Sequence, residues 1–216
     1  MILEDVIPIT YMGGTGGFFL CHLIVSAKRN IQDIIELSEH GNAHTNSLTD
    51  LAGPIYGISK PDIIKINHLI DQVQQVKNQN IEKPYYTFAH ITDINLINLY
   101  FKKSIRITYE YDDINEIANV FYGKYYYDWI KKVESKELYK NLYKNELAVN
   151  LNKFTEIENM PNILFISWKE YLRGNIDDLI YKLSTFTDIH VGNFSKESLI
   201  HWRNKTQYCI DTFTEI

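Results

Sequence analysis

The segment VIPITYMGGTGGFFLCHLIV, residues 6–25, joins two apolar runs through four glycines. The first run, Val6–Tyr11, is short and β-branched, which is typical of a buried strand. The second run starts at Phe18, continues to about Arg29 and predicts a core-facing helix. Strand, glycine turn and helix in this order open many nucleotide-binding α/β folds, so we expect such a fold here.

The turn between the two runs, Gly13-Gly14-Thr15-Gly16-Gly17, predicts an anion-binding site. Clustered glycines let the backbone turn sharply and direct several amides at one anion, and the next helix adds its positive end. A plain glycine-rich turn is the alternative. The turn is not a Walker A loop, because it lacks Gly-Lys-Ser/Thr, and this weakens an ATPase or kinase interpretation.

Strands and helices alternate along the rest of the chain. Expected strands are Tyr85–Ala89, Ser104–Tyr109 and Asn162–Ser167. Expected helices are Ile31–Glu39, Pro61–Asn80, Asp93–Phe101, Asp112 to about Lys132, a helical region to about Asn150, Asp177–Phe186 and a last helix from Ser195. The pattern predicts one α/β domain over residues 1–216, a three-layer α/β/α fold with a mainly parallel sheet of the P-loop nucleotide-binding type. Ligands of such sheets bind at the carboxyl ends of the strands.

Charge and composition limit the classes of partner that we expect this protein to bind. The net charge of −5 argues against sequence-independent nucleic-acid binding, which needs a basic face. No stretch approaches the roughly 18 consecutive apolar residues of a membrane span, so we expect no membrane partner. Two cysteines, Cys21 and Cys209, make no disulfide framework, and we expect them unbridged in a cytoplasmic protein.

Five short segments occur in the order of a known family. Tyr11–Gly16 is similar to a Tyr-Pro-Lys-Ser-Gly-Thr-Thr turn, and Tyr86–His90 falls where a strand ends in Lys-Thr-His. Ile105–Asn119 falls where a strand leads to Arg-Asn-Pro-x-Asp and a helix with a serine. Ile166–Glu170 matches the place of a Tyr-Glu-Asp element, and Trp202–Asn204 is similar to a Trp-Lys-Asn segment. Over nearly the whole chain this order resembles the P-loop sulfotransferases, which transfer sulfate from 3′-phosphoadenosine 5′-phosphosulfate (PAPS).

The resemblance implies a PAPS-dependent sulfotransferase that needs no metal. Its acceptor would be a hydroxyl or amine of a small molecule, with carbohydrates among the candidates. The Gly13–Gly17 amides would hold the 5′-phosphosulfate, and His90 would be the catalytic base, because an imidazole titrates near neutrality and can take the acceptor's proton. A structural histidine at a strand end is the alternative. The other nucleotide-binding positions implied by the resemblance are Tyr111, Asn119, Trp202, Arg203 and Asn204.

Three positions depart from the family pattern. Met12 replaces the loop lysine, while Tyr111 and Asn119 replace the arginine and serine that hold the 3′-phosphate. Either other cations act, or the donor differs, or the domain binds without catalysing; the candidate cations are Lys124, Lys169, Arg203 and Lys205. A non-catalytic nucleotide- or sugar-binding member of the fold therefore remains an alternative, and a nucleotide kinase-like phosphotransferase is a weaker one.

One histidine pair has the spacing of two metal ligands on a helix. His40 and His44 are four residues apart, but Gly41 and Asn42 lie between them and no third ligand is evident, so a polar loop is the better interpretation. In the sulfotransferase-like fold this loop lies where acceptors enter, and His44 is therefore expected to contact substrate.

Overall fold

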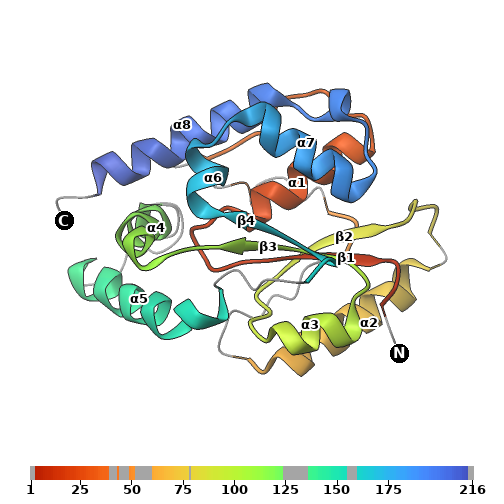
Figure 1. The fold of residues 1–216 in the computed structure, drawn as a ribbon, viewed down its shortest axis with the longest axis horizontal. Helices are drawn as coiled ribbons and strands as arrows, with labels where there is room; N and C mark the ends of the chain where they lie inside the picture. The colour runs from red at the N-terminus through yellow and green to blue at the C-terminus, as the bar shows by residue number, and fades with distance from the viewer. Residues whose placement is uncertain are drawn as a thin grey trace.

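A parallel sheet forms the middle of the molecule. The structure, a computed structural model, describes residues 3–38, 43, 49–51, 60–77, 79–123, 136–154 and 160–213. Within them, the strands pair in parallel in the order β2-β1-β3-β4 (Figure 1). Their bounds are Val6–Thr10 for β1, Tyr85–Ala89 for β2, Ser104–Thr108 for β3 and Ile163–Ser167 for β4. The expected α/β class and parallel sheet are confirmed.

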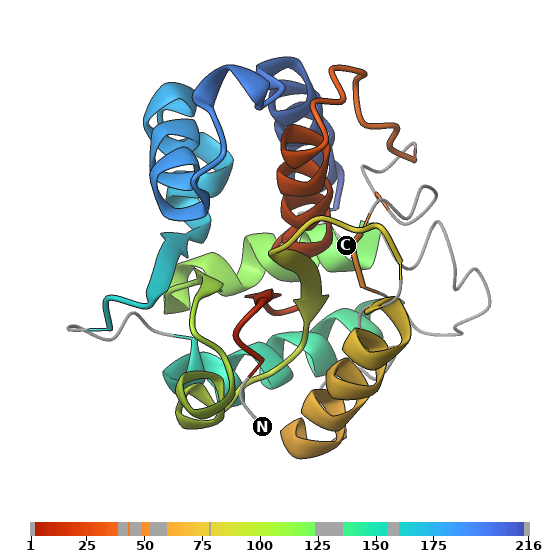
Figure 2. The ribbon, with the colours of Figure 1, turned by 90° about the vertical axis from the view of Figure 1, so that its right-hand side faces the viewer.

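Helices cover both faces of this sheet, as both ribbon views show (Figures 1 and 2). One face carries α1 (Gly17–Lys28), α6 (Trp168–Arg173), α7 (Ile176–Thr187) and α8 (Lys196–Thr212). The other face carries α2 (Asp62–Val76), α3 (Ile94–Tyr100) and α5 (Lys136–Asn150). Helix α4 (Ile114–Tyr122) contacts both α5 and α8, and it therefore spans the two layers beside the carboxyl end of β3.

The alternation of β1 explains why both faces need a cover. Ile7 and Ile9 enter the larger apolar cluster under α1, α4 and α8, whereas Val6 enters the smaller cluster against α2 and α3. Successive side chains of a strand point to opposite faces, so an apolar run such as this one is stable only between two layers. Burying each such side chain contributes about 2 kcal/mol.

The helices differ from the expected ones in three places. Residues 31–38 contain no helix. The Ile35 amide instead donates to the hydroxyl of Ser198, in the first turn of α8, at 3.0 Å, and this hydrogen bond joins the segment to α8. Helix α6 was not expected, although the Ser167 side chain caps it by accepting from the Glu170 amide at 3.1 Å. The long helix expected to reach Lys132 is described only as far as Gly123.

Two further findings concern the described residues. Cys21 and Cys209 are both buried and unbridged, and burial raises the pKa of the Cys21 thiol well above its ordinary value. In the part of the chain that the structure describes, no helix is long and apolar enough to cross a bilayer.

Candidate functional site

The glycine turn between β1 and α1 is shaped by close packing. Gly14 and Gly16 have φ angles of 79° and 78°, in the left-handed region that glycine adopts without strain. A Cβ on Gly14 would lie 2.7 Å from the Ile117 carbonyl oxygen, and one on Gly16 would lie 2.2 Å from the Trp202 ring. Both positions therefore require glycine for conformation and for space.

Two tyrosines fix the direction of the turn's peptide groups. Tyr143 donates its hydroxyl hydrogen bond to the Gly13 carbonyl at 2.7 Å, and Tyr171 donates to the Gly16 carbonyl at 3.3 Å. In a trans peptide the next N–H points opposite to the carbonyl, so the amides of Gly14 and Gly17 point away from these tyrosines. Burial raises the pKa of Tyr171 well above its ordinary value, which keeps its hydroxyl a donor.

The amides of Gly14 and Gly17 are suited to donate hydrogen bonds to an anion. No described residue accepts a hydrogen bond from the amide of Gly14 or Gly17. Helix α1 also has no side-chain cap at Gly16, whereas Asn175 caps α7 by accepting from two amides. A buried amide needs a partner, and the uncapped start of a helix favours a negative one. Thr15 does not contribute its hydroxyl, which donates to the Met12 carbonyl at 2.6 Å.

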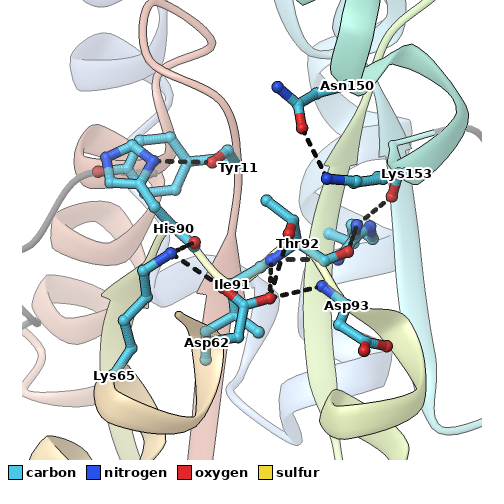
Figure 3. Close-up of polar contacts among 10 residues, drawn as sticks. Tyr11, Asp62, Lys65, His90, Ile91, Thr92, Asp93, Asn150 and Lys153 are labelled. Atoms are coloured by element: carbon cyan, nitrogen blue, oxygen red, sulfur yellow. Dashed lines mark hydrogen bonds and ion pairs between the residues drawn. The ribbon is translucent and has the colours of Figure 1, made fainter. Parts of the chain in front are cut away.

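His90 lies at the same edge of the sheet. β1 and β2 pair Thr10 with Ala89, so Tyr11 and His90 both follow the last pair of the ladder. The His90 Nδ1 lies 3.0 Å from the Tyr11 carbonyl oxygen, and the two rings pack at 4.5 Å (Figure 3). A carbonyl only accepts, so Nδ1 carries the hydrogen, and Nε2 is the nitrogen that takes up a proton.

Tyr11 connects this histidine to the glycine turn. A Cβ on Gly17 would lie 2.2 Å from the Tyr11 ring, so the ring packs directly on the first residue of α1. The other side of the contact is the His90 imidazole. Imidazole and helix start are therefore held by one buried aromatic ring at the carboxyl edge.

The backbone that carries His90 is clamped by the first turn of α2. Lys65, whose side chain is fully buried, donates to the His90 carbonyl at 2.5 Å and pairs with Asp62 at 2.9 Å. The other Asp62 oxygen accepts from the Thr92 and Asp93 amides at 2.8 and 2.7 Å (Figure 3). Burial alone would raise the pKa of Asp62, but the hydrogen bonds from Asp93 and Lys65 lower it below its ordinary value. Asp62 is therefore an ionised tether, by which we mean a carboxylate that joins the first turn of α2 to the backbone after His90.

A buried guanidinium supports the next residues. Arg106, on β3, is fully buried and donates to the carbonyls of Ile91, Thr92 and Lys153 and to the Thr10 hydroxyl. Its cation lies 4.2 Å from the centre of the Phe154 ring. Burial lowers the pKa of Arg106 to about 10, and at neutral pH it is still charged. The guanidinium charge is thus stabilised by neutral hydrogen-bond acceptors, three backbone carbonyls and one hydroxyl.

The other residues implied by the resemblance fall in different places. Trp202 is fully buried and stacks on Tyr171 at 4.4 Å as well as on Gly16, so it borders the turn. Asn119 is buried on α4, the helix whose Ile117 packs on Gly14. Tyr111 is 71% exposed in the short helix Tyr111–Asp113 after β3.

Arg203 has a structural task in α8. Its three guanidinium nitrogens donate to the carbonyls of Tyr171, Gly174 and Glu170 at 2.8, 2.7 and 3.1 Å, closing the end of α6. Asn204, the next residue, is exposed. The structure therefore gives the Arg203 side chain a set of protein partners at the place where a nucleotide contact was expected.

Of the other candidate cations, Lys169 and Lys205 lie in the described part of the chain. Lys169 pairs with Glu110 at 3.0 Å, and Lys205 is half-buried on α8. Lys124 and the expected substrate residue His44 lie outside the described residues. Met12, at the place of the family lysine, is fully buried. Among the described residues no group of three His, Cys, Asp or Glu side chains is placed to hold a metal ion.

Sequence reasoning missed the supports of His90. A signal existed for Lys65, because it lies on the buried stripe of α2 with Ile66 and Leu69, where a lysine needs a partner. Arg106 likewise stands inside a strand whose five residues are all buried. The carbonyl of Tyr11 as the acceptor for His90 follows only from the register of β1 and β2.

Comparison with known proteins adds no relative: no family model, no curated protein and no solved structure matches the chain.

Proposed function

We propose that this protein is a PAPS-dependent sulfotransferase of the P-loop type, acting at the carboxyl edge of its sheet. The observation that supports the proposal is the packing of the Tyr11 ring against both the His90 imidazole and Gly17, the first residue of the uncapped helix α1. An anion at the Gly14 and Gly17 amides would then lie next to a group that accepts a proton. The order of motifs along the chain supports PAPS as the sulfuryl donor.

The chemistry assigns a role to each group. His90 Nε2 takes the proton of the acceptor hydroxyl as its oxygen forms a bond to sulfur. The sulfur–oxygen bond to the 5′-phosphate breaks, and adenosine 3′,5′-bisphosphate leaves with the electron pair. Amides of the turn stabilise the charge that develops on the leaving phosphate oxygen. The Tyr11 carbonyl keeps the imidazole in the tautomer that this step needs.

The buried Met12 favours a second candidate, a domain that binds the nucleotide without transferring sulfate. A methionine supplies no charge at the point where the family uses a lysine, and the Met12 side chain is fully buried. In that case the bisphosphate binds and no acceptor is modified.

Calorimetric titration with adenosine 3′,5′-bisphosphate, and with ATP and Mg²⁺ for comparison, tests the proposal. The bisphosphate should bind selectively, and labelled sulfate should pass from PAPS to a hydroxyl compound in a panel that includes simple sugars. His90→Ala should lower that transfer by about a hundredfold and leave bisphosphate affinity within about twofold, because a base acts on the acceptor proton.

His190→Ala is the matched control. His190 is exposed at the opposite edge, where it accepts from the Gly192 amide, so its loss should change neither transfer nor affinity. Binding of ATP and Mg²⁺ in preference to the bisphosphate would contradict the proposal, and bisphosphate binding without any transfer would select the second candidate.

A further inference from the structure

A cleft of about 730 Å³ opens beside the backbone that carries His90. It lies between the starts of α2 and α3 and the short helix Leu151–Lys153. Thr92 lines it, two residues after His90, so the two Cα atoms are at most about 7 Å apart. The volume falls in the ordinary range of small-molecule sites.

Two lysines of the cleft lack a carboxylate partner among the residues that the structure describes. Lys60 and Lys153 both line it, and both side chains are exposed. Within the described part of the chain, Lys60 makes no ion pair, and Lys153 Nζ donates only to the neutral Asn150 amide at 3.1 Å. Two ammonium groups therefore face one cavity with their charge available.

The carboxylates of the cleft are committed to the protein. Asp62 is paired with Lys65 and accepts from two amides, and Asp93 caps α3 by accepting from the Asn95 amide at 2.9 Å. Behind the wall, Arg106 donates to the carbonyls of Thr92 and Lys153, two residues of the lining. Its Nε has no partner among the described residues.

These charges leave the cleft positive. Asp62 is paired with Lys65, and the buried positive charge of Arg106 lies close enough to interact electrostatically with both Asp62 and Asp93. Lys60 and Lys153 remain in excess. The polar lining beside them offers the Asn95 side-chain amide and the Thr92 hydroxyl, which donates to Asp62 at 3.1 Å and can still accept from a sugar hydroxyl.

We infer that this cleft binds the anionic group of the acceptor, and that the acceptor is an acidic sugar carrying a carboxylate or sulfate ester. The inference rests on the proposed function only in naming the bound sugar as the acceptor. Lys60 and Lys153 pair with the anion, and a neighbouring hydroxyl extends toward His90. The amides of the glycine turn serve the donor, so two anions occupy two separate places along one edge.

The test is direct binding of three matched disaccharides, in the absence of any nucleotide: cellobiose, cellobiouronate and cellobiose 6-sulfate. Chemical-shift changes of the Thr92 and Asn95 amides locate the site. Both anionic sugars should bind about tenfold more tightly than cellobiose, and added salt should weaken only them. The tighter of the two identifies the anion as carboxylate or sulfate ester.

The double variant Lys60→Gln with Lys153→Gln should remove that tenfold advantage. Lys102→Gln, an exposed lysine at the opposite edge, is the control and should retain it. Unchanged melting temperatures verify that both variants fold. Equal affinity for neutral and anionic sugars, or the same loss in the control, would overturn the inference. Because no nucleotide is present, loss of bisphosphate binding leaves this result standing and bears on the proposed function alone.

Discussion

The lysines that line the cavities at the two edges of the sheet differ in their partners. At the amino edge, a cavity of about 830 Å³ is lined by Lys28, Lys83, Lys102 and Lys103. Each of these pairs with a carboxylate: Lys83 with Asp5, Lys28 with Asp50 at 2.9 Å, Lys103 with Asp188 at 3.5 Å and Lys102 with Glu4 at 3.7 Å. At the carboxyl edge, Lys60 and Lys153 line a cleft without such a partner in the described chain.

The difference separates charge that holds the fold from charge that is available to a ligand. A paired charge is neutralised within the protein, and removing one partner leaves the other buried or exposed without compensation. An unpaired charge beside a cavity contributes little to folding and acts on whatever enters. Size does not distinguish the two cavities, because their volumes are similar.

The largest expected effect belongs to the amino edge. Asp50 is buried and accepts from Lys28, Arg29 and the Tyr86 amide. Asp50→Asn should lower the free energy of unfolding by about 3–5 kcal/mol, because Lys28 is then buried without its counter-charge. Urea denaturation measures this. Glu4→Gln, at the exposed pair with Lys102, is the control and should change little; a similar loss there would break the comparison.

Packing at the carboxyl edge should give the next effect. Gly16→Ala adds a Cβ that meets the Trp202 ring in a left-handed conformation. We expect a loss of about 3 kcal/mol in unfolding free energy, from strain of 1–2 kcal/mol and overpacking of similar size. Gly192→Ala is the control, since its Cβ would lie 3.2 Å from His190 without a positive φ. Equal stability of the two variants would show that Trp202 gives way easily.

The smallest effect should depend on pH. It concerns Asp62, a carboxylate at the carboxyl edge that is paired with a lysine, as the carboxylates at the amino edge are. It therefore sharpens the comparison. Asp62→Asn should lower the unfolding free energy at pH 7 by about 2 kcal/mol, the size of charged hydrogen bonds. Its folded pKa lies below the unfolded one, so the ionised group stabilises above the unfolded pKa, and this stability is lost as pH falls through the folded value.

Denaturation curves from pH 7 down to about 2 check this. Wild type and Asp62→Asn should converge as the pH falls below about 4, the ordinary pKa of an aspartate. Asp93→Asn should follow wild type, because asparagine caps a helix as well as aspartate does. A constant difference between wild type and Asp62→Asn across this range would contradict the assignment of Asp62 as an ionised tether.

The sequence predicts the sheet well because each strand is a short apolar run bounded by turn residues. Strand Tyr85–Ala89 is predicted with its observed bounds, and β1 differs from its prediction by one residue. The missed helix α6 had a local signal, since Ser167 and Glu170 form a Ser-x-x-Glu capping pattern. Residues 31–38 had none, because the Ile35–Ser198 hydrogen bond joins distant parts of the chain.

For the site, local patterns reached the turn and His90 but not their supports. The glycines and the strand-end histidine are each visible in a few neighbouring residues. Other contributions to the site depend on which segments meet in space. Examples are the Tyr11 carbonyl beside His90, the Lys65 ammonium on the His90 carbonyl, and Lys153 in the cleft. A pairing between separated segments depends on the topology, and single-sequence patterns do not contain it.

The contact between Trp202 and Gly16 also sets a time order for the maturation of this protein. During synthesis β1 and α1 leave the ribosome early, whereas α8 follows after all the other described helices. Until α8 docks, the glycine turn lacks the aromatic surface that supports its left-handed backbone. If the turn binds a nucleotide as proposed, its amides are therefore supported for binding only after α8 has been synthesised and has docked.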